Sequence, residues 1–214
     1  STVTAEQRAQ RARLEREKRA RNQVLARISR DIWRHPQEIG KLKRDETRLA
    51  RLVASLAKLM ARPKPSPRPR GERATPVPSD DSAFGRLKGR LAPPVRGELA
   101  NRFGSPRADG GVTWKGLFIR SASGAEVKAI AGGRVVFADW LRGFGNLMIV
   151  DHGGSYMSLY GNNETIHKQV GDAVHGGDTI ATVGNSGSNP DSGLYFELRH
   201  QGKPFDPLNW VRIK

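Results

Sequence analysis

The sequence predicts a mostly β C-terminal domain, with antiparallel sheets of the barrel or sandwich type, after an α-helical N-terminal part. The chain up to Ala61 is rich in Ala, Arg, Glu, Gln and Lys, which favour helix. From Leu91 onward, glycines separate short β-rich runs such as "EVKAIAGGRVVFADW" and "GNLMIVDHG", a pattern typical of strands. Six prolines lie between Pro63 and Pro78. We therefore expect the end of a coiled coil (1–35), an amphipathic helix (36–62), a Pro-rich linker (63–90) and the β domain (91–214).

The positive charge of the chain lies almost wholly in its N-terminal part. The formal net charge is +16, and residues 1–90 carry 24 Lys and Arg against 10 Asp and Glu. Residues 91–214 carry 13 against 11. Such an imbalance indicates nucleic acid or another anionic surface as a partner. Because no aromatic-interleaved basic strand or zinc finger accompanies it, we expect no nucleic-acid partner and interpret the charge as the solvated face of an extended helix.

Three absences in the sequence limit what the chain does. It has no cysteine, so neither a disulfide framework nor a thiolate metal site is available. No apolar run approaches membrane-spanning length, so we expect no direct membrane insertion. The opening "STVTAEQRAQ" is polar and unlike a signal peptide, and we interpret it as a cut inside a longer chain.

The first predicted helix has a sparse apolar stripe. Leu14 is followed by Leu25, Ile28 and Ile32, at three- and four-residue spacing in the later part. A narrow stripe of this kind is typical of the end of a coiled coil. The residue before a proline is pushed out of the helical region, so His35-Pro36 predicts an interruption.

The second predicted helix has a much denser apolar face and a basic remainder. One interpretation is the return helix of an antiparallel coiled coil. The other is an amphipathic helix that docks into a groove elsewhere on the same protein. Helical periodicity fits both interpretations, although the dense face indicates burial against more than one thin helix. The apolar residues of this face are Ile39, Leu42, Leu49, Leu52, Val53, Leu56, Leu59 and Met60.

The Pro-rich segment predicts an extended tether. Alternating prolines remove backbone donors and deny both helix and sheet hydrogen bonds. A passive linker is the preferred interpretation, and a Pro-rich ligand for another domain is the second.

The C-terminal part resembles a known family. "GAEVKAIAGGRVVFADWLRGFGNLMIVDHGGSYMSLYGN" followed by "VGDAVHGGDTIATVGNSG" is similar to the LytM (lysostaphin-type) zinc endopeptidase domain, which cleaves peptidoglycan cross-links. The resemblance covers about residues 91–210 and is carried by many spaced glycines and hydrophobic residues. It implies the LytM-like β fold.

The resemblance also implies that the zinc ligands are lost. Active members hold zinc with a His and an Asp of a His-x-Gly-x-Asp stretch and with the last His of His-x-His. In this chain Trp114 and Phe118 stand at the first two positions and Tyr195 at the third, while Gly193 replaces the catalytic His and Asn162 the auxiliary one. Hydrolytic zinc requires three protein ligands and an open position for water. We therefore expect no enzyme activity, no metal and no cofactor.

The five histidines do not supply another metal site. None forms a pair at ligand spacing or has a matching carboxylate, so we interpret all five as structural. They are His35, His152, His167, His175 and His200.

The replaced positions suggest a binding surface instead. They line an open cleft in the resembling fold, and a cleft lined with aromatic side chains binds partners. We expect Lys115 and Arg199 to flank this cleft and to offer charge-assisted contacts to acidic partners. The predicted groove consists of Lys115, Phe118, Phe144, Leu147, Tyr195 and Arg199.

An inactive LytM domain behind a coiled coil resembles the EnvC family of murein hydrolase activators. The family resemblance implies a periplasmic protein at the division septum of a Gram-negative bacterium. It implies zinc N-acetylmuramyl-L-alanine amidases as partners, and the FtsEX complex as the partner of a coiled coil that is largely missing here. We further expect residues 38–60 to cover the groove as a self-inhibitory helix, through Leu42, Leu49, Leu52, Leu56 and Leu59.

Alternative functions remain open from the sequence. A peptidoglycan-binding module would have retained the substrate cleft, and a cryptic zinc endopeptidase would need ligands that the pattern does not show. A lipoyl- or biotinyl-like domain is suggested only by the hairpin pattern of "VGDAVHGGDTIATVG", which lacks a suitable lysine at its tip.

Overall fold

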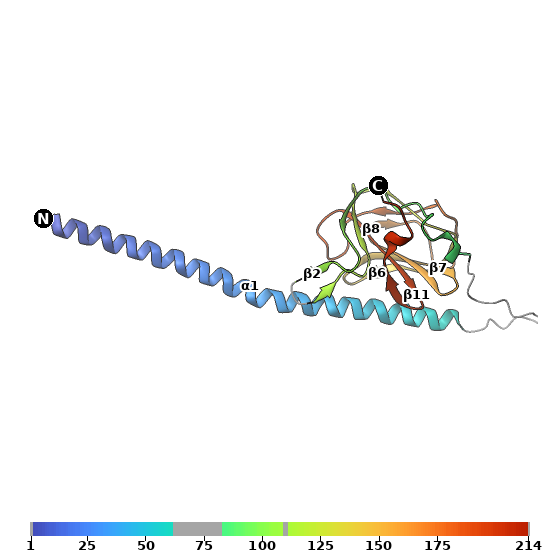
Figure 1. Ribbon diagram of the computed structural model, residues 1–214, viewed down its shortest axis with the longest axis horizontal. Helices are drawn as coiled ribbons and strands as arrows, with labels where there is room; N and C mark the ends of the chain where they lie inside the picture. The colour runs from blue at the N-terminus through green and yellow to red at the C-terminus, as the bar shows by residue number, and fades with distance from the viewer. Residues whose placement is uncertain (1, 62–82, 109–110, 214) are drawn as a thin grey trace, which may run out of the picture.

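The computed structural model describes residues 2–61, 83–108 and 111–213. A single long helix, α1 (Thr2–Met60), leads to the β domain and runs beneath it with its C-terminal part (Figure 1). At about 1.5 Å per residue, this helix is about 90 Å long.

The predicted interruption at His35-Pro36 is wrong, because α1 continues through Pro36. A proline removes one backbone hydrogen bond and costs roughly 3 kcal/mol inside a helix. That cost is local, whereas the flanking turns keep their own hydrogen bonds and the later ones pack on the β domain. The two predicted helices are therefore parts of one.

The β domain consists of twelve strands and two short 3-10 helices in the described residues. Most strands are short, and the three longest are consecutive in the chain. The elements are η1 (Gly85–Leu87), β1 (Glu98–Asn101), β2 (Pro106–Ala108), β3 (Val112–Thr113), β4 (Leu117–Arg120), β5 (Glu126–Lys128), β6 (Gly133–Leu141), β7 (Gly145–Gly153), β8 (Tyr156–Ile166), β9 (Ala173–Val174), β10 (Thr179–Val183), β11 (Gly193–His200), β12 (Lys203–Phe205) and η2 (Pro207–Asn209).

The strands form one large sheet with the order β1-β4-β11-β8-β7-β6-β9. β10 joins β5 to β8, β12 pairs with β11, and β2 and β3 form a separate pair. All these strand pairs are antiparallel. The mostly β, antiparallel prediction is therefore confirmed.

Alternation along the strands separates two buried clusters. On β11, Leu194, Phe196 and Leu198 enter the principal core, while Tyr195 points to the opposite face. Successive side chains of a strand point to opposite faces, so one sheet serves both clusters. The principal core contains no described residue of α1.

The β domain begins earlier than the predicted boundary at residue 91. Phe84 is buried in the principal core and stacks on His152 and Trp210, with ring centroids 4.4 and 4.9 Å apart. A single aromatic anchor of this kind leaves no periodic signal in the sequence. The part of the predicted linker from 63 to 82 lies outside the described residues.

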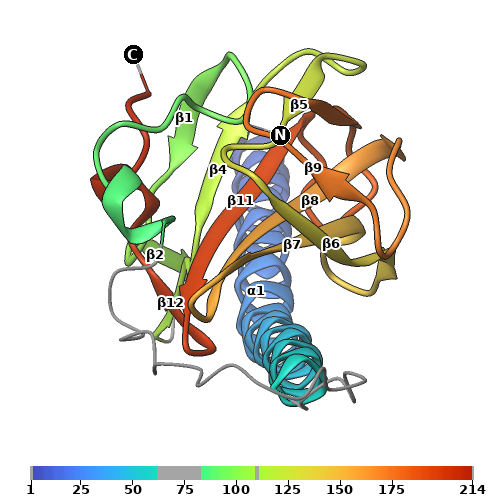
Figure 2. The same cartoon turned by 90° about the vertical axis from the view of Figure 1, so that its right-hand side faces the viewer.

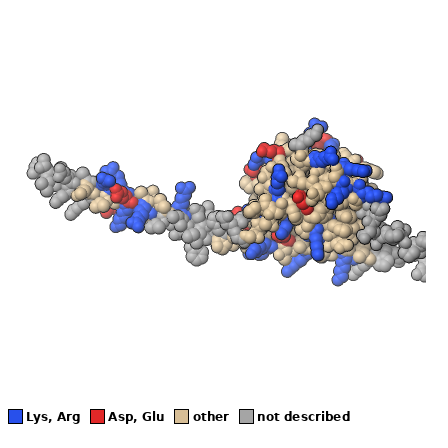
Figure 3. All heavy atoms as spheres, viewed as in Figure 1, with Lys and Arg blue, Asp and Glu red and all other residues tan. Residues whose placement is uncertain are grey.

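The C-terminal part of α1 lies along one face of the sheet, whereas its N-terminal part extends away from the domain (Figures 1 and 2). Among residues 10–27, the side chains that the structure describes are exposed, and many are Lys or Arg (Figure 3). Among the described residues, no helix is long and apolar enough to cross a membrane.

Candidate functional site

The second buried cluster forms where α1 crosses the sheet, and we call its β-domain side the apolar groove. Four of the six predicted groove residues, Phe118, Phe144, Leu147 and Tyr195, are buried in it together. Register explains part of this arrangement, because Tyr195 pairs directly with Phe118 across β11 and β4. The cluster comprises Leu49, Val53, Trp114, Phe118, Phe144, Leu147, Ile149, Met157, Leu159 and Tyr195.

α1 supplies the cover of the apolar groove. Leu49 is 1% exposed and Val53 is fully buried, and their spacing of four positions puts them on one helix face. Leu52 and Leu56 are partly buried against the same cluster, whereas Leu59 is 59% exposed. The structure thus places four of the five predicted helix leucines on the domain side, because Leu42 lines a pocket together with Tyr195. Leu59 lies outside this contact.

The three residues that the resemblance assigns to ligand positions, Trp114, Phe118 and Tyr195, lie together as an aromatic group. The ring centroid of Trp114 is 6.3 Å from those of both Phe118 and Tyr195, and the centroid of Phe144 is 5.3 Å from that of Tyr195. Trp114 and Phe118 offer no metal-ligand oxygen or nitrogen lone pair. The residues gathered here therefore do not fit the zinc ion of active LytM domains.

Asn162, which the resemblance assigns to the auxiliary histidine position, forms hydrogen bonds to the backbone of neighbouring segments. Its side-chain amide donates to the carbonyl oxygens of Gly184 at 3.0 Å and Gly193 at 2.9 Å, and its Oδ1 accepts from the Gly187 N–H at 2.8 Å. Asn162 itself has a positive φ, in the left-handed region that Asn adopts more readily than most residues. This side chain therefore ties β8 to the β10–β11 loop and to the start of β11, beside the aromatic group.

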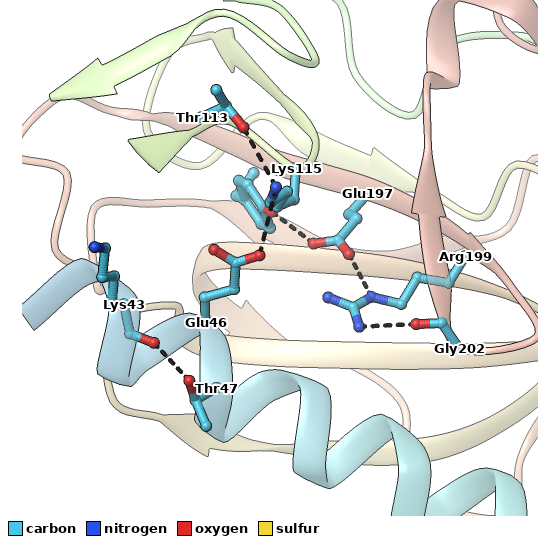
Figure 4. A network of polar contacts seen from close by, with 9 residues as sticks. Lys43, Glu46, Thr47, Thr113, Lys115, Glu197, Arg199 and Gly202 are labelled. Carbon is cyan, nitrogen blue, oxygen red and sulfur yellow. Dashed lines mark hydrogen bonds and ion pairs between the residues drawn. The ribbon is translucent and has the colours of Figure 1, made fainter. Parts of the chain in front are cut away.

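A buried carboxylate organises the floor of the groove on β11. The Tyr195 hydroxyl donates to Glu197 Oε2 at 2.6 Å, and Arg199 Nε donates to the other oxygen, Oε1 (Figure 4). Arg199 also donates to the Gly202 carbonyl oxygen at 3.2 Å. Burial, and then the charge of Glu197, raise the pKa of Tyr195 well above its ordinary value, so its hydroxyl stays a donor. Burial raises the pKa of Glu197 as well, against the opposing effect of Arg199.

Arg199 is therefore not the free flanking cation that the sequence suggested. It is 3% exposed, and its guanidinium forms an internal ion pair with Glu197, which is fully buried. A buried charge needs such a partner, because removing one partner of a buried pair costs on the order of 3–5 kcal/mol. The sequence spacing, Tyr-x-Glu-x-Arg on one strand face, is the signal that could have identified this network.

Lys115 lies at the edge of the groove, where it faces an acidic residue of α1. Its Nζ is 3.8 Å from Glu46 Oε1 of α1 and 3.3 Å from the Thr113 hydroxyl (Figure 4). Both ion-pair partners are 35% exposed at their side chains. A pair this exposed contributes little stability, on the order of 0–1 kcal/mol.

Arg107 is a groove residue that sequence reasoning missed. Its guanidinium carbon lies 4.4 Å from the centre of the Trp114 ring, which is a cation–π contact. Burial lowers the pKa of Arg107, while Tyr195, Asp45 and Glu46 favour its charged form. The sequence marks Arg107 only as one basic residue in a loop-rich stretch, without periodicity.

Asp45 of α1 lies against Gly143 of the β domain. It is 5% exposed, its Oδ1 accepts from Arg48 at 2.9 Å, and its Oδ2 has no hydrogen-bond partner among the described residues. A Cβ on Gly143 would lie 2.6 Å from Asp45 Cγ. Gly143 therefore has to be glycine for α1 to lie this close.

Replacement of Gly143 by alanine is expected to loosen α1. Gly143 and Gly177 both have left-handed backbone, with φ of 92° and 91°, but a Cβ on Gly177 meets nothing within 4 Å. Each alanine costs about 1–2 kcal/mol of backbone strain, and only Gly143→Ala adds the clash with Asp45. Amide hydrogen exchange of residues 45–57 should accelerate about tenfold in Gly143→Ala alone, as a loss of about 1.4 kcal/mol requires. Equal exchange in both variants would contradict the close contact.

The described histidines are scattered rather than gathered at the groove. His152 Nδ1 forms a hydrogen bond of 2.7 Å with the Gly132 carbonyl oxygen, and burial lowers the pKa of His152 to about 4. His200 stacks on Tyr156, and His175 pairs with Asp178. No group of three or more His, Cys, Asp or Glu side chains among the described residues is placed to hold a metal ion. His35 lies within α1, and its side chain is outside the description.

Comparison with known proteins shows which family the β domain resembles. The model for peptidase family M23 matches residues 112–207, which include the groove strands. The chain is 38% identical to the murein hydrolase activator EnvC of Escherichia coli over 211 residues, which is 89% of this chain and 50% of that protein. It is also 38% identical to the murein hydrolase activator NlpD of Escherichia coli, over 55% of this chain and 30% of that protein. The chain thus spans half or less of the length of these two relatives.

Solved structures agree on the fold. A Pseudomonas aeruginosa protein assigned to peptidase M23 has a TM-score of 0.55 at 24% identity, covering 79% of this chain and 61% of its own. A zinc-containing peptidase from Vibrio cholerae has a TM-score of 0.53 at 21% identity. The match covers 59% of this chain and 41% of that protein. The chain is therefore similar to EnvC-type murein hydrolase activators, and residues 112–207 of its β domain match the model of peptidase family M23.

Proposed function

We propose that this chain is a non-catalytic activator of periplasmic zinc N-acetylmuramyl-L-alanine amidases, which split septal peptidoglycan during cell separation. The observation that carries the proposal is the apolar groove, in which the aromatic residues Trp114, Phe118 and Tyr195 are buried together and a helix of the same chain packs against them. The sequence resemblance assigns these three residues to the ligand positions of active LytM domains. Similarity to proteins named murein hydrolase activators supports the same role. The groove binds the amidase after α1 has left.

An activator of this kind works by differential binding. If the free amidase is held in a closed state, the activator has only to bind the open state better. Moving a population from 1:99 to 99:1 requires about 5.5 kcal/mol of differential binding. A groove that buries several apolar side chains, at about 1.5–3 kcal/mol each, supplies this amount.

α1 acts in this proposal as an intramolecular competitor. Because the helix and the groove belong to one chain, the effective concentration of the helix can reach about a millimolar level. An amidase at a lower concentration cannot displace α1 from the groove, so it binds only after α1 has been pulled away. We assign that pull to the FtsEX complex, acting through the coiled coil of which residues 1–35 form the end, at the division septum.

The groove assignment is tested with residues 63–214, which retain the principal core because no described α1 residue belongs to it. Phe144→Ala and Tyr195→Ala each remove a large aromatic side chain from the groove, and such losses at interface centres cost about 2 kcal/mol or more. We expect each variant to bind a cognate amidase at least about tenfold more weakly in calorimetry.

Trp140→Ala is the matched control, because Trp140 is an aromatic residue that is 56% exposed and outside the groove cluster. It should bind as the parent does. Parent-like binding by both groove variants, with unfolding midpoints also unchanged, would show that the amidase binds elsewhere.

A further inference from the structure

The outward face of α1 carries a row of basic side chains that the groove does not use. Lys41, Arg44, Arg51 and Lys58 are exposed, and Arg48 is 41% exposed at its side chain. Their spacing of three, four, three and seven positions keeps them on one helix face. At about 1.5 Å per residue the row is about 26 Å long. We call these five residues the basic row.

The basic row is separated from acidic side chains. The two acidic residues between positions 41 and 58 are Asp45 and Glu46, and both take part in the contact with the domain. Val53 is buried, and helical periodicity puts Arg44, Arg51 and Lys58 roughly opposite to it. Apart from the Asp45 contact of Arg48, the positive charge therefore faces solvent.

The shape of the molecule favours a flat anionic partner. The described part of the β domain lies on the other side of α1, so it does not obstruct contact along the row (Figures 1 and 2). Blue side chains line the edge of the helix that faces away from the domain (Figure 3). A straight row can touch many phosphates of a plane at once, whereas a cylindrical duplex curves away from it.

The residue types also favour phospholipid headgroups. Arginine presents a planar fork that matches phosphate oxygens, and lysine adds a point charge. Leu59, which is 59% exposed, follows the row directly and provides a shallow apolar contact. A basic helix face beside an exposed apolar residue fits a protein that lies on a membrane without crossing it.

We propose that the basic row binds the surface of a bilayer containing anionic phospholipids, with the domain held on the side away from the bilayer. This site is independent of the groove, since binding uses the face of α1 that remains outside whether or not the groove is covered. Each basic residue near such a surface contributes about 1 kcal/mol, so removal of three predicts a loss of roughly 100-fold at low salt.

The test is flotation of the full chain with vesicles of phosphatidylcholine and phosphatidylglycerol in equal parts, compared with vesicles of phosphatidylcholine alone. Wild type should float only with the anionic vesicles, and less so as salt is raised. The variant Arg44→Gln/Arg51→Gln/Lys58→Gln should lose at least about tenfold in partition coefficient.

The matched control, Lys88→Gln/Arg96→Gln/Lys203→Gln, removes the same charge from exposed residues of the β domain. It should float nearly as wild type does. If both triple variants lost the same amount of vesicle binding, the binding would depend on net charge alone, and the proposal would be overturned. Equal flotation with uncharged vesicles, or tighter binding to duplex DNA than to vesicles at matched phosphate concentration, would overturn it as well.

Discussion

Val53→Glu is expected to raise the amidase activation of the full chain by about tenfold or more, to the level of residues 63–214. Val53 is fully buried in the groove cluster, so the substitution places a carboxylate among apolar side chains. Burial of an unpaired charge costs several kcal/mol, which is more than the roughly 1.5–3 kcal/mol that the valine contributes when buried. Undocking α1 avoids this cost and frees the groove.

The neighbouring position provides the control. Ala54 is exposed on α1, so Ala54→Glu adds the same charge to the same helix without entering the groove. Its activation should stay at the wild-type level, measured as release of dye-labelled peptidoglycan by a purified amidase. Equal activation by both variants, or none by Val53→Glu, would contradict self-inhibition by α1.

Glu197→Gln is expected to lower the free energy of unfolding by about 3–5 kcal/mol, because breaking one half of a buried ion pair has a cost of this order. The substitution keeps the size of the side chain but leaves the buried Arg199 without its counter-charge. Urea unfolding of the full chain, in which Leu42, Glu46 and Leu49 of α1 lie over this pair, measures the loss by circular dichroism.

Removal of both charges tests the cause. Glu197→Gln/Arg199→Met eliminates the unpaired cation and fills a similar volume, so most of the lost stability should return. If the double variant is as unstable as Glu197→Gln, the pair is not the reason for the loss. Arg199→Ala is accordingly expected to destabilise the domain, rather than only to weaken partner binding.

Much of this architecture could be predicted because periodic patterns report burial directly. The gathering of Trp114, Phe118 and Tyr195 followed from the resemblance, which aligned residues far apart in the chain. The dense apolar face of residues 42–56 indicated a substantial burial partner, and the structure shows that this partner is the groove. Amphipathicity alone could not identify it, because the pattern specifies a buried face and not what covers it.

Other features depended on tertiary contacts that no local pattern encodes. Pro36 costs one hydrogen bond, so a long helix survives a residue that local preference marks as a break. The closeness of Gly143 to Asp45 involves two segments that lie far apart in the chain. For Arg199, the spacing on β11 places Glu197 on the same strand face as a partner, but the burial of both side chains depends on the tertiary structure.

The most direct test of the account is amidase binding to the full chain and to residues 63–214, measured side by side by calorimetry. We expect the shorter chain to bind at least about tenfold more tightly, and a peptide of residues 38–60 added in trans to reduce that binding competitively. A peptide with Leu49→Glu and Val53→Glu should not compete. Equal affinity of the two chains, with no effect of the peptide, would contradict the claim that α1 covers the surface to which the amidase binds.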